Sequence, residues 1–211
     1  MTDLEKLHEA VVEGNWKAAA AATQAVLADG MAPVDVVNRS LVPAMDEVGR
    51  RFDCEEYFVP EMLLSARAMK ASMEILRPLL ATAGAEPAGR VVIGTVKGDL
   101  HDIGKNLVAA MLEGGVFEVI DLGADVAPER FVEAAAARNA NLVALSALLT
   151  VTMTSMKTTI EAFRAAGLRG KVKIMVGGAP VTQHYADTIG ADGYGESAGA
   201  AVALARKLVA G

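Results

Sequence analysis

The feature that most constrains the fold is a strict alternation of strand-like and helix-like segments from residue 90 onward. Short, nearly continuous apolar runs predict strands, and the stretches of helical periodicity between them predict helices. The expected strands are 90–96, 117–123, 141–147, 171–178 and 191–195, and the expected helices are 103–114, 128–139, 155–166, 182–189 and 197–209. Strands that alternate with helices in this way predict an α/β domain, in which helices cover both faces of a parallel sheet.

Five strands fit the flavodoxin-like (Rossmann-like) order 2-1-3-4-5, whose ligands bind at the carboxyl ends of the strands. The loops expected at that edge read "KGDLHDIG", "SALLTVTMT", "GGAPVTQH" and "GESAG". Three of them are rich in Gly, Ser and Thr, which let a backbone approach a ligand closely or supply a small hydroxyl. This edge is therefore the candidate binding site, and we expect it to bind a large ligand.

Residues 1–80 show helical periodicity alone. Thr2 and Glu5 predict a capping box, while Pro33 and Pro60 predict the first turns of a third helix, which runs to about Arg50, and of a fourth helix. Four helices with short connections predict a four-helix bundle. The breaker-rich segment 81–89 predicts a linker, so the expected domains are a bundle at 1–80 and an α/β domain at 90–211.

Composition narrows the class of partner. A formal net charge of −6 argues against nucleic acid, because phosphate binding needs clustered Lys and Arg. The single cysteine, Cys54, cannot form an internal disulfide, which favours a reducing compartment. The amino-terminal stretch has no apolar signal core, and no apolar run approaches the roughly 20 residues of a membrane span. These features predict a cytoplasmic protein that binds no membrane.

His101 follows the first expected strand and has two readings. In one it is a loop histidine beside a helix that Asp102 caps. In the other, Asp99 accepts the Nδ1–H of the ring and leaves Nε2 free as a base or a metal ligand. His8 and His184 lie far away in the sequence, and no Cys or His cluster has zinc-ligand spacing. The sequence therefore argues against a dedicated zinc or iron site, but it is compatible with a cofactor that brings its own metal.

Three short motifs, each directly after an expected strand, resemble the motifs of cobalamin-binding domains in the same order. They are "DLHDIG" with Asp99, His101 and Gly104, "SAL" with Ser146 and Leu148, and "GG" with Gly177 and Gly178. The segment "MDEVGRRFDCEEYFVPEMLLSARAM" resembles the helical cap of methionine synthase and of the small corrinoid proteins of methanol, methylamine and O-demethylase methyltransferase systems. The resemblance covers practically the whole chain.

The resemblance implies cobalamin, as methylcobalamin or cob(I)alamin, bound base-off with a histidine as the lower ligand of cobalt. His101 would be that metal ligand, and Asp99 would hydrogen-bond to it. In methionine synthase a serine hydroxyl completes this relay, six residues after the first Ser of its Ser-x-Leu motif. Thr152 occupies the matching position in this sequence. The implied relay is therefore His101, Asp99 and Thr152.

The resemblance also implies which other residues surround the cofactor. Those around its nucleotide tail would be Asp102, Ile103, Gly104, Ser146, Leu148, Thr150, Gly177 and Gly178, with Gly195, Glu196 and Ser197 at the tail's far end. The bundle would cover the upper, methyl-bearing face, with Met45, Phe52, Tyr57, Phe58 and Met62 as candidates. Ordinary core packing is the alternative reading of these five side chains, and for most of them it is the favoured one.

The implied function is that of a corrinoid methyl carrier, which is not catalytic alone. It would shuttle a methyl group from a substrate-specific methyltransferase to a methyl-accepting methyltransferase, with a reductive activator protein as a further partner. The donor, which the sequence does not identify, would be methanol, a methylamine, a betaine or an aryl methyl ether.

Three other functions stay open. One is the cobalamin-binding subunit of an adenosylcobalamin mutase, against which the helical cap argues. Another is a cobalamin-dependent sensor or regulator, which would carry a DNA-binding domain and fits the acidic charge poorly. The third is a response module without a cofactor, which needs an acidic phospho-acceptor pocket that Asp99 and His101 do not resemble.

Overall fold

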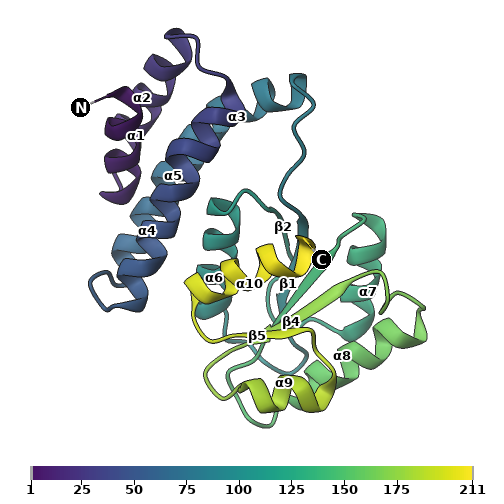
Figure 1. Cartoon of the computed structure of the whole chain (residues 1–211). Helices are drawn as coiled ribbons and strands as arrows, with labels where there is room; N and C mark the ends of the chain where they lie inside the picture. The colour runs from purple at the N-terminus through teal and green to yellow at the C-terminus, as the bar shows by residue number, and fades with distance from the viewer. Residues whose placement is uncertain (1, 211) are drawn as a thin grey trace. The chain divides into compact units, whose positions relative to one another are not determined.

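The computed structural model of the chain describes residues 2–210. Contacts between Cα atoms divide the chain into two compact units (Figure 1). The first unit holds the residues up to Pro87 together with Glu113–Val116, and the second holds Ala88–Leu112 together with the residues from Phe117 on. The first unit is helical and the second is an α/β sheet structure, so the predicted fold class is confirmed.

The helices of the first unit follow one another with short connections. They are α1 (Asp3–Val12), α2 (Trp16–Ala28), α3 (Pro33–Val36), the π-helix η1 (Val37–Leu41), α4 (Val42–Asp53) and α5 (Val59–Thr82). The capping box is confirmed, because Thr2 Oγ1 accepts the amide hydrogen of Glu5 and the Glu5 carboxylate accepts that of Thr2. The carbonyl of Val12 at the end of α1 accepts hydrogen bonds from Tyr57 Oη and Ser65 Oγ, which join α1 to the start of α5.

The predicted third helix is built from three consecutive segments, α3, η1 and α4. It runs from Pro33 to Asp53, three residues beyond the expected end at Arg50, and its middle is π-helical. There the amide of Val42 donates to the carbonyl of Val37, five residues earlier. Pro43 is the next residue. It has no amide hydrogen to donate, and in a regular α-helix its ring would clash with the carbonyl four residues earlier. The wider π turn accommodates both effects. Helical periodicity alone did not predict this change of pitch.

The fourth helix, α5, has Pro60 in its first turn, as predicted. It continues to Thr82, two residues into the segment expected to be a linker, and Thr82 Oγ1 donates to the carbonyl of Pro78 within the last turn. Its buried face carries Met62, Met69, Met73 and Leu76 at helical spacing. No helix among residues 2–210 is both long and apolar enough to cross a membrane.

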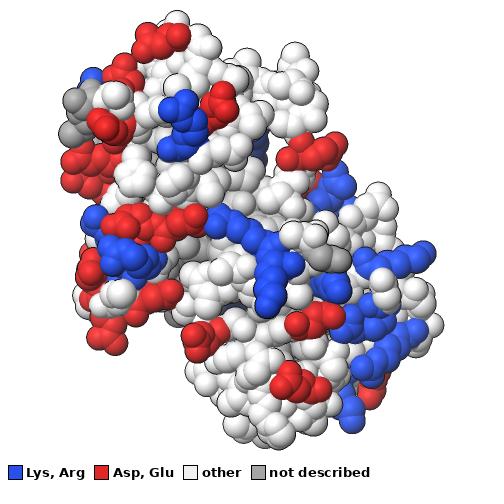
Figure 2. Space-filling model, in the orientation of Figure 1, with Lys and Arg blue, Asp and Glu red and all other residues white. Residues whose placement is uncertain are grey.

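Exposed ion pairs cover part of the first unit. Acidic and basic side chains lie next to one another on its visible face (Figure 2), and the pairs include Lys6–Asp3, Arg50–Glu47 and Arg51–Glu47. Exposed pairs of this kind contribute little to stability. The buried methionine and leucine side chains of the helices are therefore the main source of the unit's stability.

The second unit contains one parallel sheet of five strands in the order β2-β1-β3-β4-β5, which confirms the predicted order. The strands are β1 (Arg90–Thr95), β2 (Glu118–Asp121), β3 (Leu142–Ser146), β4 (Lys173–Gly177) and β5 (Gly193–Gly195). The register places Ile93, Ala144, Met175 and Gly193 side by side across four strands. Because side chains alternate along a strand, these four residues share one face of the sheet.

Helices cover both faces of this sheet (Figure 1). They are α6 (Ile103–Gly114), α7 (Pro128–Ala137), α8 (Thr154–Ala165), α9 (Gln183–Ile189) and α10 (Ala198–Ala210). On one face, Val143 and Val176 pack in a continuous core with Phe131 of α7 and Phe163 of α8. The opposite face, which carries Ile93, Ala144 and Met175, is turned toward α6 and α10, and there the packing is incomplete.

Candidate cofactor site at the carboxyl edge of the sheet

The loop that carries His101 begins with a tight turn after β1. The amide of Asp99 donates to the carbonyl of Val96, and Gly98 adopts φ +86°, a conformation that favours glycine. The amide of Gly98 donates to Asp125 Oδ1 at 2.8 Å, so the segment after β2 holds this turn from the side. The turn directs the Asp99 side chain inward, where it is fully buried.

The Asp99 carboxylate accepts hydrogen bonds on both oxygens. Oδ1 lies 2.8 Å from His101 Nδ1 and also accepts the backbone amide of His101 at 3.0 Å. Oδ2 accepts the amides of Leu148 and Leu149, at 2.8 and 3.2 Å, and the hydroxyl of Thr152 at 2.6 Å. Burial alone would raise the pKa of Asp99, but the hydrogen bonds from Thr152, Leu148 and His101 outweigh it and hold that pKa well below its usual range. Asp99 is therefore a carboxylate that joins the loop after β1 to the loop after β3.

This arrangement determines how the imidazole is presented. Since the ionised Asp99 carboxylate can only accept, Nδ1 of His101 carries a hydrogen, and in the neutral ring the lone pair is on Nε2. The His101 side chain is 51% exposed. Large apolar side chains from the same two loops are also exposed, namely Leu100, Ile103, Leu148, Leu149 and Val151. The Nε2 atom, which can bind a metal, is therefore accessible and surrounded by apolar side chains that would suit a flat, apolar ligand.

The one available ligand atom, Nε2 of His101, fits a metal ion whose other ligands come from a cofactor. Among residues 2–210, no group of three or more His, Cys, Asp and Glu side chains could hold a metal ion. Asp99 is already saturated with hydrogen bonds and is not exposed. His101 Nε2 therefore offers a single bond, which is what a metal macrocycle with one open axial position requires.

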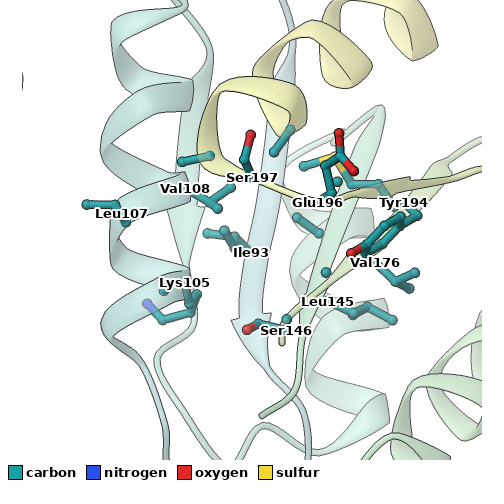
Figure 3. A pocket seen from close by; sticks show the side chains of 18 of the residues that line it. Ile93, Lys105, Leu107, Val108, Leu145, Ser146, Val176, Tyr194, Glu196 and Ser197 are labelled. Atoms are coloured by element: carbon teal, nitrogen blue, oxygen red, sulfur yellow. The ribbon is translucent and has the colours of Figure 1, made fainter. Parts of the chain in front are cut away.

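Beside this loop a cavity of about 360 Å³ opens between the sheet, α6 and α10 (Figure 3). Its lining residues are Ile93, Gly104, Lys105, Leu107, Val108, Ala144, Leu145, Ser146, Met175, Val176, Gly177, Gly178, Ala179, Tyr194, Gly195, Glu196, Ser197, Ala198 and Ala201. The volume is in the range of sites for small molecules and cofactors.

Polar side chains line the cavity at two places (Figure 3). Ser146, the last residue of β3, and Lys105, in the first turn of α6, lie at the lower end of the view. Glu196 and Ser197, between β5 and α10, lie at the upper end, near Tyr194 of β5. Ser197 also accepts the amide hydrogen of Ala200 on its Oγ, which satisfies one free amide at the start of α10.

Most of the other lining side chains are apolar. They include Ile93, Ala144 and Met175 from adjacent strands, Val108 of α6 and Ala201 of α10. The cavity thus combines an apolar wall with polar side chains at two places.

Two glycines of the expected motifs act in different ways. Gly178 has φ +126°, and a Cβ there would lie 1.9 Å from the carbonyl oxygen of Ala147, so the backbone itself requires glycine. A Cβ on Gly104 would meet nothing within 4 Å, and this residue lines the cavity. Gly104 therefore leaves open space in the cavity wall, which fits a bulky ligand at this place.

The structure brings most of the predicted tail-binding residues to one cavity. Those that line it are Gly104, Ser146, Gly177, Gly178, Gly195, Glu196 and Ser197. Asp102, Ile103, Leu148 and Thr150 are exposed on the neighbouring loops and do not line it. The Asp102 carboxylate accepts a hydrogen bond from Asn106 Nδ2 at 3.1 Å.

The sequence analysis gave no role to Lys105, which directly follows Gly104 of the first motif. Its side chain is buried, and Nζ donates to Asp121 Oδ2 at the end of β2 and to Asn106 Oδ1. This pair attaches the first turn of α6 to the sheet. The available signal was a lysine in the first turn of an otherwise apolar helix, followed by an aspartate at the end of the next strand.

The five candidate cap residues differ in their exposure. Met45 and Met62 are buried within the first unit, and Tyr57 donates to the carbonyl of Val12 from a partly buried position. Phe52 is also partly buried. Phe58 is 64% exposed, so among the five it is the side chain most available for contact with another group.

Comparison with known proteins identifies the family of this chain. Family models described as B12 binding domain match residues 89–203 and, separately, residues 3–77. The chain therefore belongs to the B12-binding family, whose cofactor is cobalamin.

Similar proteins cover nearly the whole chain. A corrinoid protein of Desulfitobacterium hafniense is 41% identical over 99% of this chain and 98% of its own length. Trimethylamine corrinoid protein 2 of Methanosarcina acetivorans is 44% identical over 94% of this chain and 93% of its own length. In the crystal structure of the methanol:cobalamin methyltransferase complex of Methanosarcina barkeri, the matching chain has a TM-score of 0.86 at 30% identity, covering 99% of this chain and 80% of that one.

Proposed function

We propose that the chain is a corrinoid methyl carrier, which holds cobalamin base-off with His101 as its lower ligand and shuttles a methyl group between two methyltransferases. When bound, cobalamin supplies the cobalt centre that accepts and releases the methyl group. The observation that carries the proposal is the exposed His101 imidazole, which the buried Asp99 carboxylate holds beside a cavity of about 360 Å³.

In this proposal the His101, Asp99 and Thr152 side chains act as one unit. Nε2 of His101 would hold the cobalt, and the carboxylate of Asp99 orients the ring through Nδ1–H. The Thr152 hydroxyl donates to the other oxygen and so limits how much negative charge Asp99 shares with the ring. The three groups together set how strongly the lower ligand binds.

The cavity would hold the nucleotide tail of the cofactor. Lys105 and Ser197 lie where α6 and α10 begin, and the free amides of helix amino termini favour a phosphodiester group. The apolar wall of the cavity would contact the detached base, and the exposed Leu100, Ile103 and Val151 would contact the macrocycle. Gly104, where a Cβ would meet nothing within 4 Å, would leave room for the tail beside α6.

The proposed partners follow from the similar proteins. Relatives carry the names of trimethylamine and dimethylamine corrinoid proteins, and one similar structure is of a methanol:cobalamin methyltransferase complex. A substrate-specific methyltransferase and a methyl-accepting methyltransferase would dock on this chain, and a reductive activator would restore an oxidised cofactor. We propose that these proteins meet in the cytoplasm.

Reconstitution with hydroxocobalamin tests the proposal. The purified chain is expected to retain about one corrinoid per chain through gel filtration, in the base-off, histidine-on state. Visible absorption and electron paramagnetic resonance of the Co(II) state measure the ligation. A folded chain that retains no corrinoid would contradict the proposed function.

The exposure of Phe58 leads to a second prediction. Phe58→Ala is expected to leave the free energy of unfolding almost unchanged, because the side chain is 64% exposed, yet to speed air oxidation of the reduced cofactor if the ring covers its upper face. Met62→Ala, at a buried position of the same unit, should instead lower the free energy of unfolding by about 2–4 kcal/mol. Urea titration and the absorbance of the reduced cofactor in air measure the two effects. Equal oxidation rates in Phe58→Ala and the unchanged chain would assign Phe58 another role.

A further inference from the structure

A buried hydroxyl at the end of β1 holds the main chain of His101. Thr95 is the last residue of β1 and is fully buried. Its Oγ1 donates a hydrogen bond to the carbonyl oxygen of His101 at 2.9 Å. The amide of Thr95 donates to the carbonyl of Gly123, and its carbonyl accepts the amide of Val126, so its backbone is fixed on both sides. The carbonyl of His101 is therefore attached to a rigid part of the sheet.

The turn that precedes the histidine is held separately. The Asp125 carboxylate accepts the amide of Gly98 at 2.8 Å, and the Asp125 amide donates to the carbonyl of Asp99 at 2.9 Å. Both of these bonds act on residues that come before the histidine in the chain. The bond from Thr95 holds the chain on the other side, at the carbonyl through which His101 is joined to the next residue. The loop is thus restrained both before and after the imidazole.

The two kinds of restraint complement each other. The Asp99 carboxylate contacts the ring Nδ1 and the amide of His101, whereas Thr95 contacts its carbonyl. Without the second contact, the His101 main chain could turn, and the loop would populate conformations in which Nε2 points elsewhere. The apparent affinity of a ligand falls by the fraction of the protein that is in the competent conformation. A weaker hold on the carbonyl would therefore weaken any bond that Nε2 makes.

We propose that Thr95 is a positioning residue for the lower ligand, and that its hydroxyl holds the His101 carbonyl so that Nε2 stays aligned for ligation. This inference rests on the proposed function, in which His101 binds cobalt. Thr95 is not among the residues that line the cavity, so it acts through His101 rather than on the cofactor. A buried hydroxyl that serves only to satisfy its own hydrogen-bonding group would stabilise the fold and leave ligation unaffected. The two roles can be separated by experiment.

Displacement of the histidine by cyanide tests the inference on the full chain loaded with cobalamin in the Co(III) state. Cyanide binds cobalt and displaces a nitrogen lower ligand, and visible absorption gives the concentration that displaces half of it. Thr95→Val removes the hydroxyl but keeps the shape of the side chain, and about fivefold less cyanide should suffice, as expected for the loss of one neutral hydrogen bond. Thr95→Ser keeps the hydroxyl and should stay within about twofold of the unchanged chain.

A second threonine of the same unit provides the matched control. Thr159 is as fully buried as Thr95, and its Oγ1 donates to the carbonyl of Ser155 at 2.8 Å within α8. Thr159→Val therefore removes a buried hydroxyl of the same kind away from the histidine. It should leave the cyanide concentration unchanged, whatever its effect on the free energy of unfolding.

The chain without cofactor gives an independent measurement. Hydrogen exchange of the His101 amide, followed by nuclear magnetic resonance, reports how often the loop opens. Thr95→Val is expected to speed this exchange by about fivefold, for the same reason as above. Thr95→Ser and Thr159→Val should leave it close to that of the unchanged chain.

The outcomes distinguish the inference from the function beneath it. If Thr95→Val needs as much cyanide as the unchanged chain, or if Thr95→Ser is weakened equally, the hydroxyl does not position the ligand and the inference is wrong, while the carrier function stands. If the unchanged chain shows no histidine ligation at all, the proposed role of His101 is wrong and the inference with it. Thr95→Ala, which also lacks the hydroxyl, takes the same tests if Thr95→Val fails to fold.

Discussion

His101→Ala is expected to abolish the histidine-ligated spectrum of the Co(III) protein while the chain still binds cobalamin through its tail. The tail cavity does not include the imidazole, so loss of the ring should leave most of the binding surface intact. Water or the cofactor's own base would then occupy the lower position of cobalt. Visible absorption, together with the nitrogen hyperfine pattern of the Co(II) state, reports this change directly.

A matched histidine variant controls this experiment. His184 is exposed on α9, and His184→Ala should leave the spectrum unaltered. If His101 serves only to pack at the start of α6, its loss should lower stability by about 1 kcal/mol with no spectral change. An unchanged spectrum in His101→Ala would therefore exclude the role as metal ligand.

Asp99→Asn is expected to destabilise the second unit by about 3 kcal/mol, because an amide group replaces a buried oxygen that faces only donors. Whichever way the new amide turns, its NH2 meets the donors of either His101 or Leu148, and some of them lose their acceptor. Urea unfolding of the unchanged chain and the variant measures the difference. Asp125→Asn, at an exposed carboxylate of the adjacent turn, is the control and should have a smaller effect.

The stability difference should depend on pH in a defined direction. The pKa of Asp99 is held below its ordinary value of 3.8 in the folded chain, so in acid the unfolded chain takes up the proton first. The contribution of Asp99 is therefore fully present near neutral pH and shrinks as pH falls below about 5. The difference between the unchanged chain and Asp99→Asn should shrink over the same interval. A constant difference down to about pH 3 would mean that the variant acts through shape alone.

Much of the fold could be predicted because its determinants are local. Each strand is a short apolar run and each helix has its own periodicity, and the strand order followed from the number of strands and their strict alternation with helices. The π-helical segment Val37–Leu41 could not be predicted in this way, since it depends on how the chain accommodates Pro43 within a continuing helix. The extension of α5 to Thr82 depends similarly on side-chain bonding within its last turn.

In the candidate site, too, the local contacts could be predicted and the long-range contacts could not. The contact between Asp99 and His101 was predictable from two residues that lie close in sequence. The hydrogen bond from the Leu149 amide to Asp99 joins the loops after two different strands, and the Lys105–Asp121 pair joins α6 to the end of β2. No spacing pattern in the sequence indicated either contact. The cavity between the sheet, α6 and α10 was not predictable either. Its strand residues read as ordinary core, and only the spacing of α6 and α10 from the sheet leaves the space above them open.

The turn at Asp99 also bears on the entropy of ligand binding. A histidine on a free loop would lose rotational freedom when it binds a metal, and that loss would weaken the bond. Here the carboxylate that orients the ring is itself held by two amides and a hydroxyl of the 148–152 segment, so its own torsions are restricted before any ligand arrives. The imidazole is accessible yet already aligned. Most of the ordering that ligation demands has therefore taken place during folding.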